Sequence, residues 1–128
     1  MKHRKLRLRW FVAAALAGVL AFVVFNFEAL MLGAAVWFGD KRPALLRDAR
    51  WDDPGSAKQF NQRFSAGADE AVLLDWLQNN RFDVDQAHKR ADRLVESLPC
   101  GELVEVSWRA GEGKLVDAAA TVTEAGCL

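Results

Sequence analysis

The chain has 128 residues, which suffices for one domain of ordinary size and an appendage, but not for two full domains. Its zero net charge conceals an asymmetry: residues 1–51 carry nine Lys or Arg against three Asp or Glu, whereas residues 52–128 carry eight against fourteen. A basic, apolar first part followed by an acidic second part indicates two pieces that lie in different surroundings.

Residues 1–9 form a basic flank, with the run "KHRKLRLR" immediately ahead of an apolar stretch. Such a run is able to contact nucleic acid or anionic lipid. Directly before an apolar segment, however, it is typical of the cytoplasmic end of a membrane helix. We therefore expect no nucleic-acid partner for this chain.

Residues 10–38 are predicted to be a transmembrane signal anchor whose partner is the lipid bilayer. No polar side chain occurs from Trp10 to Phe25, and Asn26 and Glu28 are the only interruptions over the next seven residues. A helix over these 23 residues rises roughly 34 Å, which is enough to cross the hydrocarbon core. On that rise Glu28 lies about 27 Å from Trp10, near the far boundary, where its carboxylate reaches the headgroups.

A cleaved signal peptide is the main alternative for this segment, because the basic flank suits both. The apolar stretch is long for a signal peptide, and residues 33–35 make a poor cleavage site, since Val, Trp and Phe follow at once. The denser positive charge on the N-terminal side favours a cytoplasmic N-terminus. We expect a single-pass protein of the bacterial inner membrane with a periplasmic C-terminal part.

Residues 39–57 are predicted to be a juxtamembrane linker, in which Pro43 starts a short helix and "DDPGS" breaks the chain. Residues 58–128 are predicted to form a small periplasmic α+β domain of two helices and an antiparallel hairpin or small sheet. Its first helix begins after Gly67, because Val, Leu, Trp and Leu in "DEAVLLDWLQNN" recur at helical spacing. Acidic residues at its start complement the helix dipole.

The second helix is predicted over residues 85–98. Asp85 is a good N-cap, Pro99 limits the far end, and the apolar residues of "DVDQAHKRADRLVESLP" fall on one helical face. In such a helix His88 pairs with Asp92, four residues later. A lone histidine on a charged face indicates a surface residue and no metal site.

Two segments near the C-terminus, "ELVEVSWR" and "LVDAAATVT", alternate with a period of two around the glycine-rich turn "AGEGK". They predict a β-hairpin. With a three-residue turn, Trp108 faces Val116 and Val104 faces Ala120, so that the apolar side chains of both strands share one face. Helices are expected to pack on that face.

Cys100 and Cys127, the two cysteines of the chain, bracket this hairpin. The expected export to an oxidising compartment predicts a disulfide between them. In the predicted register Cys100 faces Glu124, so the tail is expected to curl back at Gly126 to bring the sulfurs together. A redox pair or metal site is the alternative, but there is no CxxC motif and no nearby histidine to support it.

The run "RFSAGADEAVLLDWLQNNRFDVD", with the later "PCGELVEVSWRAGEGKLV" and the terminal "GCL", resembles small uncharacterised membrane-anchored proteobacterial proteins. The first half of this region is also similar to the BamE/SmpA type of outer-membrane assembly accessory. In that type a Gly-Thr pair opens a helix before paired helices and a sheet. Here Ala68 stands in place of the threonine, and the lipidated cysteine of that type is absent. The resemblance implies a helix-pair-plus-sheet fold.

The main functional hypothesis is a non-enzymatic accessory protein that binds another envelope or membrane protein. Aromatic and arginine side chains are common anchors of interfaces. The candidate interface residues are Trp51, Phe60, Phe64, Arg81 and Phe82. For each phenylalanine the competing interpretation is that it fills the core.

The alternative hypothesis is a small-ligand-binding or enzymatic domain. It would need titratable groups that converge in a pocket, for which the acidic candidates are Asp69, Glu70, Asp75, Asp83 and Asp85. The sequence contains no recognisable catalytic, cofactor-binding or metal-binding motif. We therefore expect no catalytic residues, no cofactor and no metal ion.

Overall fold

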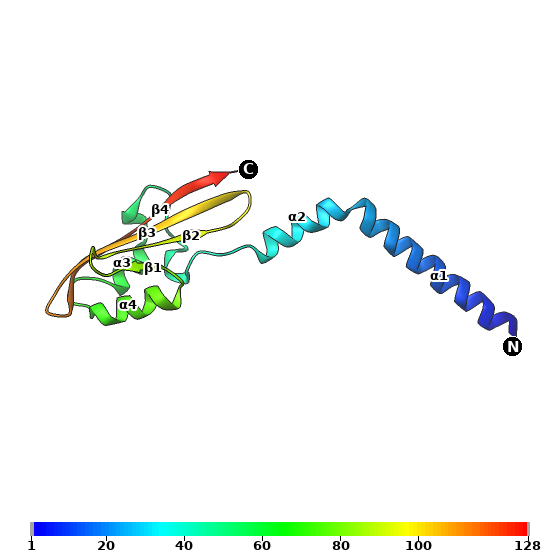
Figure 1. Cartoon of the computed structure of the whole chain (residues 1–128), viewed down its shortest axis with the longest axis horizontal. Helices are drawn as coiled ribbons and strands as arrows, with labels where there is room; N and C mark the ends of the chain where they lie inside the picture. The colour runs from blue at the N-terminus through cyan, green and yellow to red at the C-terminus, as the bar shows by residue number, and fades with distance from the viewer. Residues whose placement is uncertain (1, 128) are drawn as a thin grey trace. The chain divides into compact units, whose positions relative to one another are not determined.

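The structure is a computed structural model that describes the backbone of residues 2–127 and the side chains of residues 10–127. The chain divides into two compact units, one that ends at Phe38 and one that begins at Gly39. The side chains of the basic flank at residues 1–9 lie outside the described part. Figure 1 traces the elements along the chain.

The first unit consists of two helices, α1 (Lys2–Phe25) and α2 (Phe27–Phe38). Trp10–Phe25 and Phe27–Phe38 meet at an angle of 71°. The amide Nδ2 of Asn26 donates to the carbonyl oxygen of Phe22 at 2.9 Å, and a polar side chain that bonds to the preceding turn commonly accompanies a helix bend. Residues 10–38 therefore do not form the one continuous helix that was predicted.

Among residues 2–127, no single helix is both long enough and apolar enough to cross a bilayer. The two helices meet that requirement only when they are taken together as a bent pair, on length and composition.

The second unit is an α+β domain, which confirms the predicted class. Its four strands form one antiparallel sheet in the order β1-β2-β3-β4, and helices α3 and α4 pack against the sheet (Figure 1). The strands are β1 (Asp83–Asp85), β2 (Arg90–Val95), β3 (Cys100–Gly111) and β4 (Lys114–Cys127). The helices are α3 (Lys58–Arg63) and α4 (Glu70–Asn79), preceded by the 3-10 turns η1 (Ala44–Leu46) and η2 (Pro54–Ser56).

One hydrophobic core fills the space between the helices and the covered face of the sheet. Val104, Val106 and Trp108 alternate along β3 with exposed residues, as the period of two predicted. Helices α3 and α4 and the residues that follow them contribute an aromatic cluster in which neighbouring ring centroids lie 4.9–5.6 Å apart. Its members are Phe60, Phe64, Trp76 and Phe82. The first predicted helix of the domain is confirmed as α4.

The helix predicted over residues 85–98 is wrong, because this segment forms the β1–β2 hairpin. Ala91 and Val95 are buried, whereas Leu94, which was expected on the apolar helical face, is 51% exposed. Strand β2 pairs with β3 along its whole length, and this pairing outweighs the helix-like spacing of the apolar residues. His88 lies in the turn and contacts Asp85 at 2.6 Å, not Asp92.

The β3–β4 hairpin has the predicted apolar face but a different register. Val104 faces Val122 and Trp108 faces Ala118, each two residues beyond the predicted partner. The turn contains two residues, not three, and the register then shifts at Arg109/Ala110 and again at Gly101/Glu102. Such shifts are β-bulges, in which one strand holds an extra residue. The alternation of apolar residues along the sequence does not predict where they occur.

The segment 39–57, which was predicted as a linker, packs onto the domain. Leu46 and Ala57 are fully buried in the core, and the backbone N–H of Asp52 donates to the carbonyl of Val122 on β4 at 2.9 Å. This segment therefore runs beside β4, whose outer edge would otherwise present unpaired backbone groups.

Candidate interaction surface

Cys100 and Cys127 form a disulfide, as predicted, with Cα atoms 4.0 Å apart. The predicted route is wrong, however: the tail does not curl back. Strand β4 stays extended as far as Cys127, and the register shifts bring Cys127 directly opposite Cys100. The carboxylate of Glu124 lies close to both sulfurs, but the disulfide leaves no thiolate for a metal ion at this end of the sheet.

A cluster around Glu102 holds the segment that follows the apolar helices. The guanidinium of Arg42 forms a two-pronged ion pair with the Glu102 carboxylate, with Nε donating to Oε2 at 2.5 Å. The indole N–H of Trp51 donates to Oε1 of Glu102 at 2.8 Å. These partners, above all Arg42, lower the pKa of Glu102 despite the burial that opposes them. The Glu102 side chain is 12% exposed, so this carboxylate acts as a fixed structural group.

A second cluster lies around Asp40. Nη2 of Arg93 on β2 donates to both oxygens of the Asp40 carboxylate at 2.7 and 2.8 Å. The backbone N–H of Asp40 donates to the carbonyl of Glu96 at 3.1 Å. Burial raises the pKa of Asp40, but the Arg93 hydrogen bond and charge outweigh it, and the net shift is downward.

A third cluster joins α4 to the turn between β1 and β2. The Glu70 carboxylate accepts from Lys89 Nζ at 2.6 Å and from the indole N–H of Trp108 at 2.8 Å. Both partners lower the pKa of Glu70, with Lys89 the larger cause. Glu70, one of the acidic candidates for a ligand site, is therefore already occupied by groups of its own domain.

The candidate interface residues do not share one surface. Phe60, Phe64 and Phe82 are buried in the core, which is the competing interpretation for each. Trp51 is 41% exposed while its indole N–H bonds to Glu102, and Arg81 is exposed after the end of α4. Of the five candidate side chains, Trp51 and Arg81 are therefore the two that are exposed for contact with a partner.

The other acidic candidates do not converge in an enclosed pocket within the described residues. Asp69 pairs with Lys114 at 2.5 Å, and Asp75 accepts from the amide of Asn79 at 3.0 Å. The hydrogen bond from His88 is the main cause that lowers the pKa of Asp85. These contacts are typical of a solvated protein surface.

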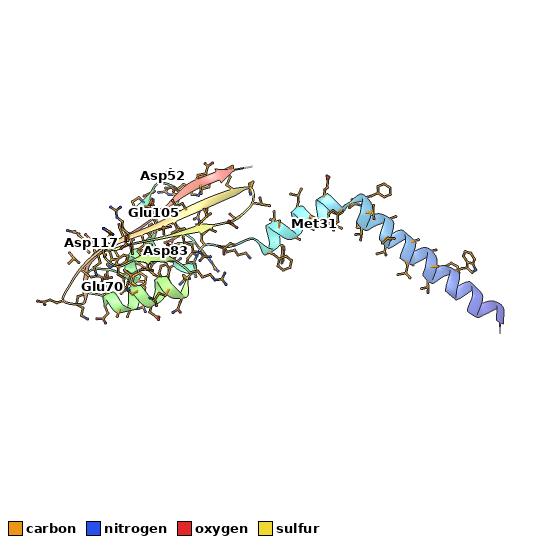
Figure 2. All side chains as sticks on the ribbon, in the orientation of Figure 1. Met31, Asp52, Glu70, Asp83, Glu105 and Asp117 are labelled. Atoms are coloured by element: carbon orange, nitrogen blue, oxygen red, sulfur yellow. A yellow bond between two sulfur atoms is a disulfide. The ribbon has the colours of Figure 1, made fainter. Side chains whose placement is uncertain are left out.

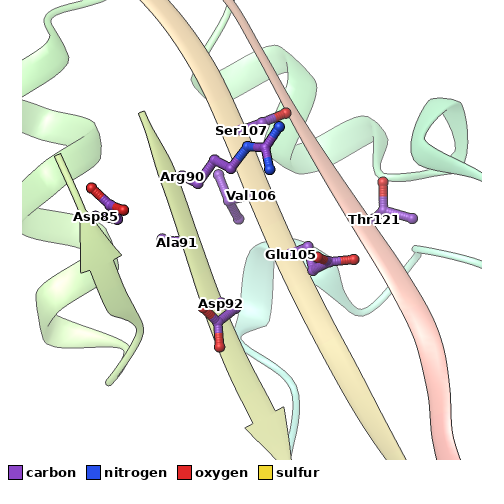
Figure 3. Close-up of a pocket in the computed structure, with 8 residues that line it drawn as sticks. All are labelled: Asp85, Arg90, Ala91, Asp92, Glu105, Val106, Ser107 and Thr121. Atoms are coloured by element: carbon purple, nitrogen blue, oxygen red, sulfur yellow. The ribbon is translucent and has the colours of Figure 1, made fainter. Parts of the chain in front are cut away.

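The uncovered face of the sheet carries a hollow, and Figure 3 shows the side chains that line it. They are Asp85, Arg90, Ala91, Asp92, Glu105, Val106, Ser107 and Thr121. Asp92 on β2 faces Asp83 on β1 and Glu105 on β3, so three exposed acids occupy one row across three strands. We call Asp83, Asp92 and Glu105 the acidic row.

Side chains that face each other across strands are close neighbours, and like charges in this arrangement are destabilising. No ion pair found among the described side chains involves a member of the acidic row. The sequence did not reveal this row, because the segment that contains Asp92 was predicted as a helix.

Comparison of the chain with protein-family models, with curated proteins and with solved structures gave no match. The resemblance to BamE/SmpA-type accessories therefore stays a prediction.

Proposed function

We propose that the protein is a single-pass membrane-anchored accessory protein whose exported α+β domain binds another envelope protein. The main support for a membrane anchor is that the apolar side chains of the first unit are exposed. Every described side chain from residue 10 to residue 38 is exposed except Asn26, and Phe25 is exposed to 87%. A run of large apolar side chains with no protein cover is stable in hydrocarbon and costly in water.

The disulfide supports export of the domain. Disulfides persist in oxidising compartments and are rare in the cytosol, where thiols are kept reduced. The denser positive charge before the apolar helices supports a cytoplasmic N-terminus by the positive-inside rule. In this topology the second unit lies on the periplasmic side of an inner membrane.

Binding, not catalysis, is the activity that the domain surface supports. Its paired acids are engaged by its own cations, and its open sheet face presents the acidic row. The occupant that fits this face is a basic segment of a second protein, because Lys or Arg side chains would relieve the repulsion between neighbouring carboxylates. Charge complementarity of this kind sets partner choice and the rate of association more than affinity.

Affinity purification of the full chain in mild detergent tests the proposal. A protein with a basic exported segment is expected to co-purify with the wild type and to be depleted with an Asp92→Asn/Glu105→Gln variant. Asp75→Asn, which removes an exposed acid on α4, is the matched control and should retain the partner. Recovery of the wild-type chain alone from cells grown under several conditions would contradict the proposal.

A further inference from the structure

We infer that the domain surface around Asp40 lies directly against lipid headgroups. The inference rests on the proposed anchoring and goes beyond it. An anchored domain that is joined to its helices by a long flexible linker would not have to lie against the bilayer. The difference depends on where the chain, once it leaves the apolar helices, becomes bonded to the domain.

The chain makes its first contacts with the domain two residues after the end of α2, at Asp40. Helix α2 ends at Phe38, and Gly39 is the one residue between it and Asp40. Asp40 is held at three points: its backbone N–H by the Glu96 carbonyl, and its two carboxylate oxygens by Arg93. The Arg93 side chain is only 10% exposed, so its guanidinium is held by its surroundings and does not swing freely with the chain.

The residues after Asp40 are also fixed to the domain. Arg42 donates to the carbonyl of Ala49 at 2.6 Å in addition to its ion pair with Glu102. Pro43 is buried, and Leu46 is fully enclosed in the core. Because β2 and β3 supply Arg93 and Glu102, the sheet itself holds this segment. Only Gly39 separates the last residue of α2 from Asp40, a span of roughly 3.5 Å, so a bilayer that contains α2 to its last residue lies next to this surface.

The charges at this surface suit a headgroup phosphate. Lys41 and Arg81 are exposed, and Arg81 is near enough to Asp40 to contribute to its lowered pKa. Asp40 is paired with Arg93, and the exposed acid Glu96 adjoins it, because the Glu96 carbonyl accepts from the backbone N–H of Asp40. Basic groups next to a membrane segment are attracted to anionic lipid.

A pair of labelled variants tests this placement. Glu96 adjoins Asp40, whereas Glu112 lies at the tip of the β3–β4 hairpin, about ten residues and roughly 33 Å along β3 from Glu102. Full-length Glu96→Cys and Glu112→Cys proteins, each with the native disulfide intact, are labelled with a small fluorophore. They are then reconstituted in vesicles of phosphatidylglycerol and phosphatidylcholine that contain a headgroup-linked quencher. We expect quenching at position 96 to be several-fold stronger than at position 112.

A flexible Gly-Ser spacer of about twelve residues, inserted between Gly39 and Asp40, is the control, because it reaches roughly 20 Å and leaves every contact of Asp40 in place. The spacer should reduce quenching at position 96 to the level at position 112. Equal quenching at the two positions without the spacer, in protein that floats with the vesicles, would overturn the inference and leave the anchoring standing. Failure of the full chain to float with vesicles would overturn the anchoring itself and the inference with it.

Discussion

At the scale of single residues, a few partly buried ion pairs decide how the domain is assembled. The Glu102 carboxylate accepts hydrogen bonds from Arg42 and Trp51, which lie in the segment after the apolar helices. The Asp40 carboxylate accepts from Arg93, which lies on the sheet. Exposed ion pairs contribute little to stability, but the Glu102 carboxylate is shielded and accepts several hydrogen bonds at once, and the more exposed Asp40 pairs with an Arg93 side chain that is only 10% exposed. Removing either carboxylate would leave a largely buried guanidinium unpaired.

Replacing Glu102 with Gln should therefore lower the free energy of unfolding by about 2–3 kcal/mol, because hydrogen bonds to a charged group are lost and the Arg42 guanidinium is left without its carboxylate. Urea unfolding of the detergent-solubilised chain at pH 7, followed by tryptophan fluorescence, measures the change. Glu112→Gln, at the exposed hairpin tip, is the control and should stay within about 0.5 kcal/mol of the wild type.

The same substitution should flatten the acid dependence of stability. The pKa of Glu102 is lower in the folded than in the unfolded protein, so its contribution is fully present above the ordinary glutamate pKa of about 4.3. It is lost as the pH falls from there through the folded-state pKa. Midpoints of urea unfolding between pH 6 and pH 3 should fall less steeply for Glu102→Gln than for the wild type, with the difference appearing below about pH 4.3.

At the scale of elements, the sheet gains its stability from long strands joined at both ends. Strands β3 and β4 meet at the turn and again at the disulfide between Cys100 and Cys127. Helices α3 and α4 cover one face through an aromatic cluster, and α4 is further tied to the β1–β2 turn by Glu70 and Lys89.

Replacing Cys127 with Ser should lower stability by roughly 3–4 kcal/mol, because the chain-entropy model assigns that amount to a loop of this length. Since one bond is lost in either case, the Cys100→Ser/Cys127→Ser double change should cost nearly the same. Thermal unfolding under non-reducing conditions, compared with the wild type in excess reductant, gives the three values. A double variant that is much less stable than the single one would contradict a simple loss of the crosslink.

Phe64→Ala should lower stability by about 3–5 kcal/mol, because Phe64 is buried against Phe60 and Trp76 and its removal leaves a cavity. Arg81→Ala, at an exposed position, should change stability by less than about 0.5 kcal/mol. Chemical unfolding of the two variants separates the core role of the phenylalanine from a role in partner contact. A stable Phe64→Ala protein would contradict the assignment of this side chain to the core.

At the scale of the whole molecule, the chain consists of a unit whose apolar side chains are exposed and a domain that is crosslinked by a disulfide. A domain of about ninety residues has a modest core, and a crosslink is a common supplement at such a size. Figure 2 shows the contrast between the first unit, whose side chains stand along a bare helical path, and the second, whose side chains gather around the sheet.

The oxidised state of the two cysteines should therefore be found in cells. Alkylation of thiols in freshly trapped cells, followed by non-reducing mass spectrometry, should recover Cys100 and Cys127 linked in the full-length chain. A variant that lacks residues 1–38 should remain in the cytosol, where reducing conditions should leave both thiols free for alkylation. Two alkylated thiols in the full-length protein would contradict export of the domain.

Some of this architecture could be predicted from the sequence, because its signals are local. The apolar stretch from Trp10 is visible as composition, helix α4 as a stripe of helical period, and β3 with β4 as alternation around a glycine-rich turn. The pairing of Cys100 with Cys127 followed because they are the two cysteines of the chain.

Tertiary contacts decided the rest. Residues 90–95 satisfy a helical pattern, yet they form a strand because β3 offers a full row of backbone partners. The bulges that set the register of β4, and the burial of Leu46 in a segment that resembles a linker, depend on elements far apart in the sequence. The acidic row and the Asp40 and Glu102 clusters arise from the same long-range pairing. A period along the chain carries the conformation of neighbouring residues, whereas only the folded sheet determines which distant side chains meet.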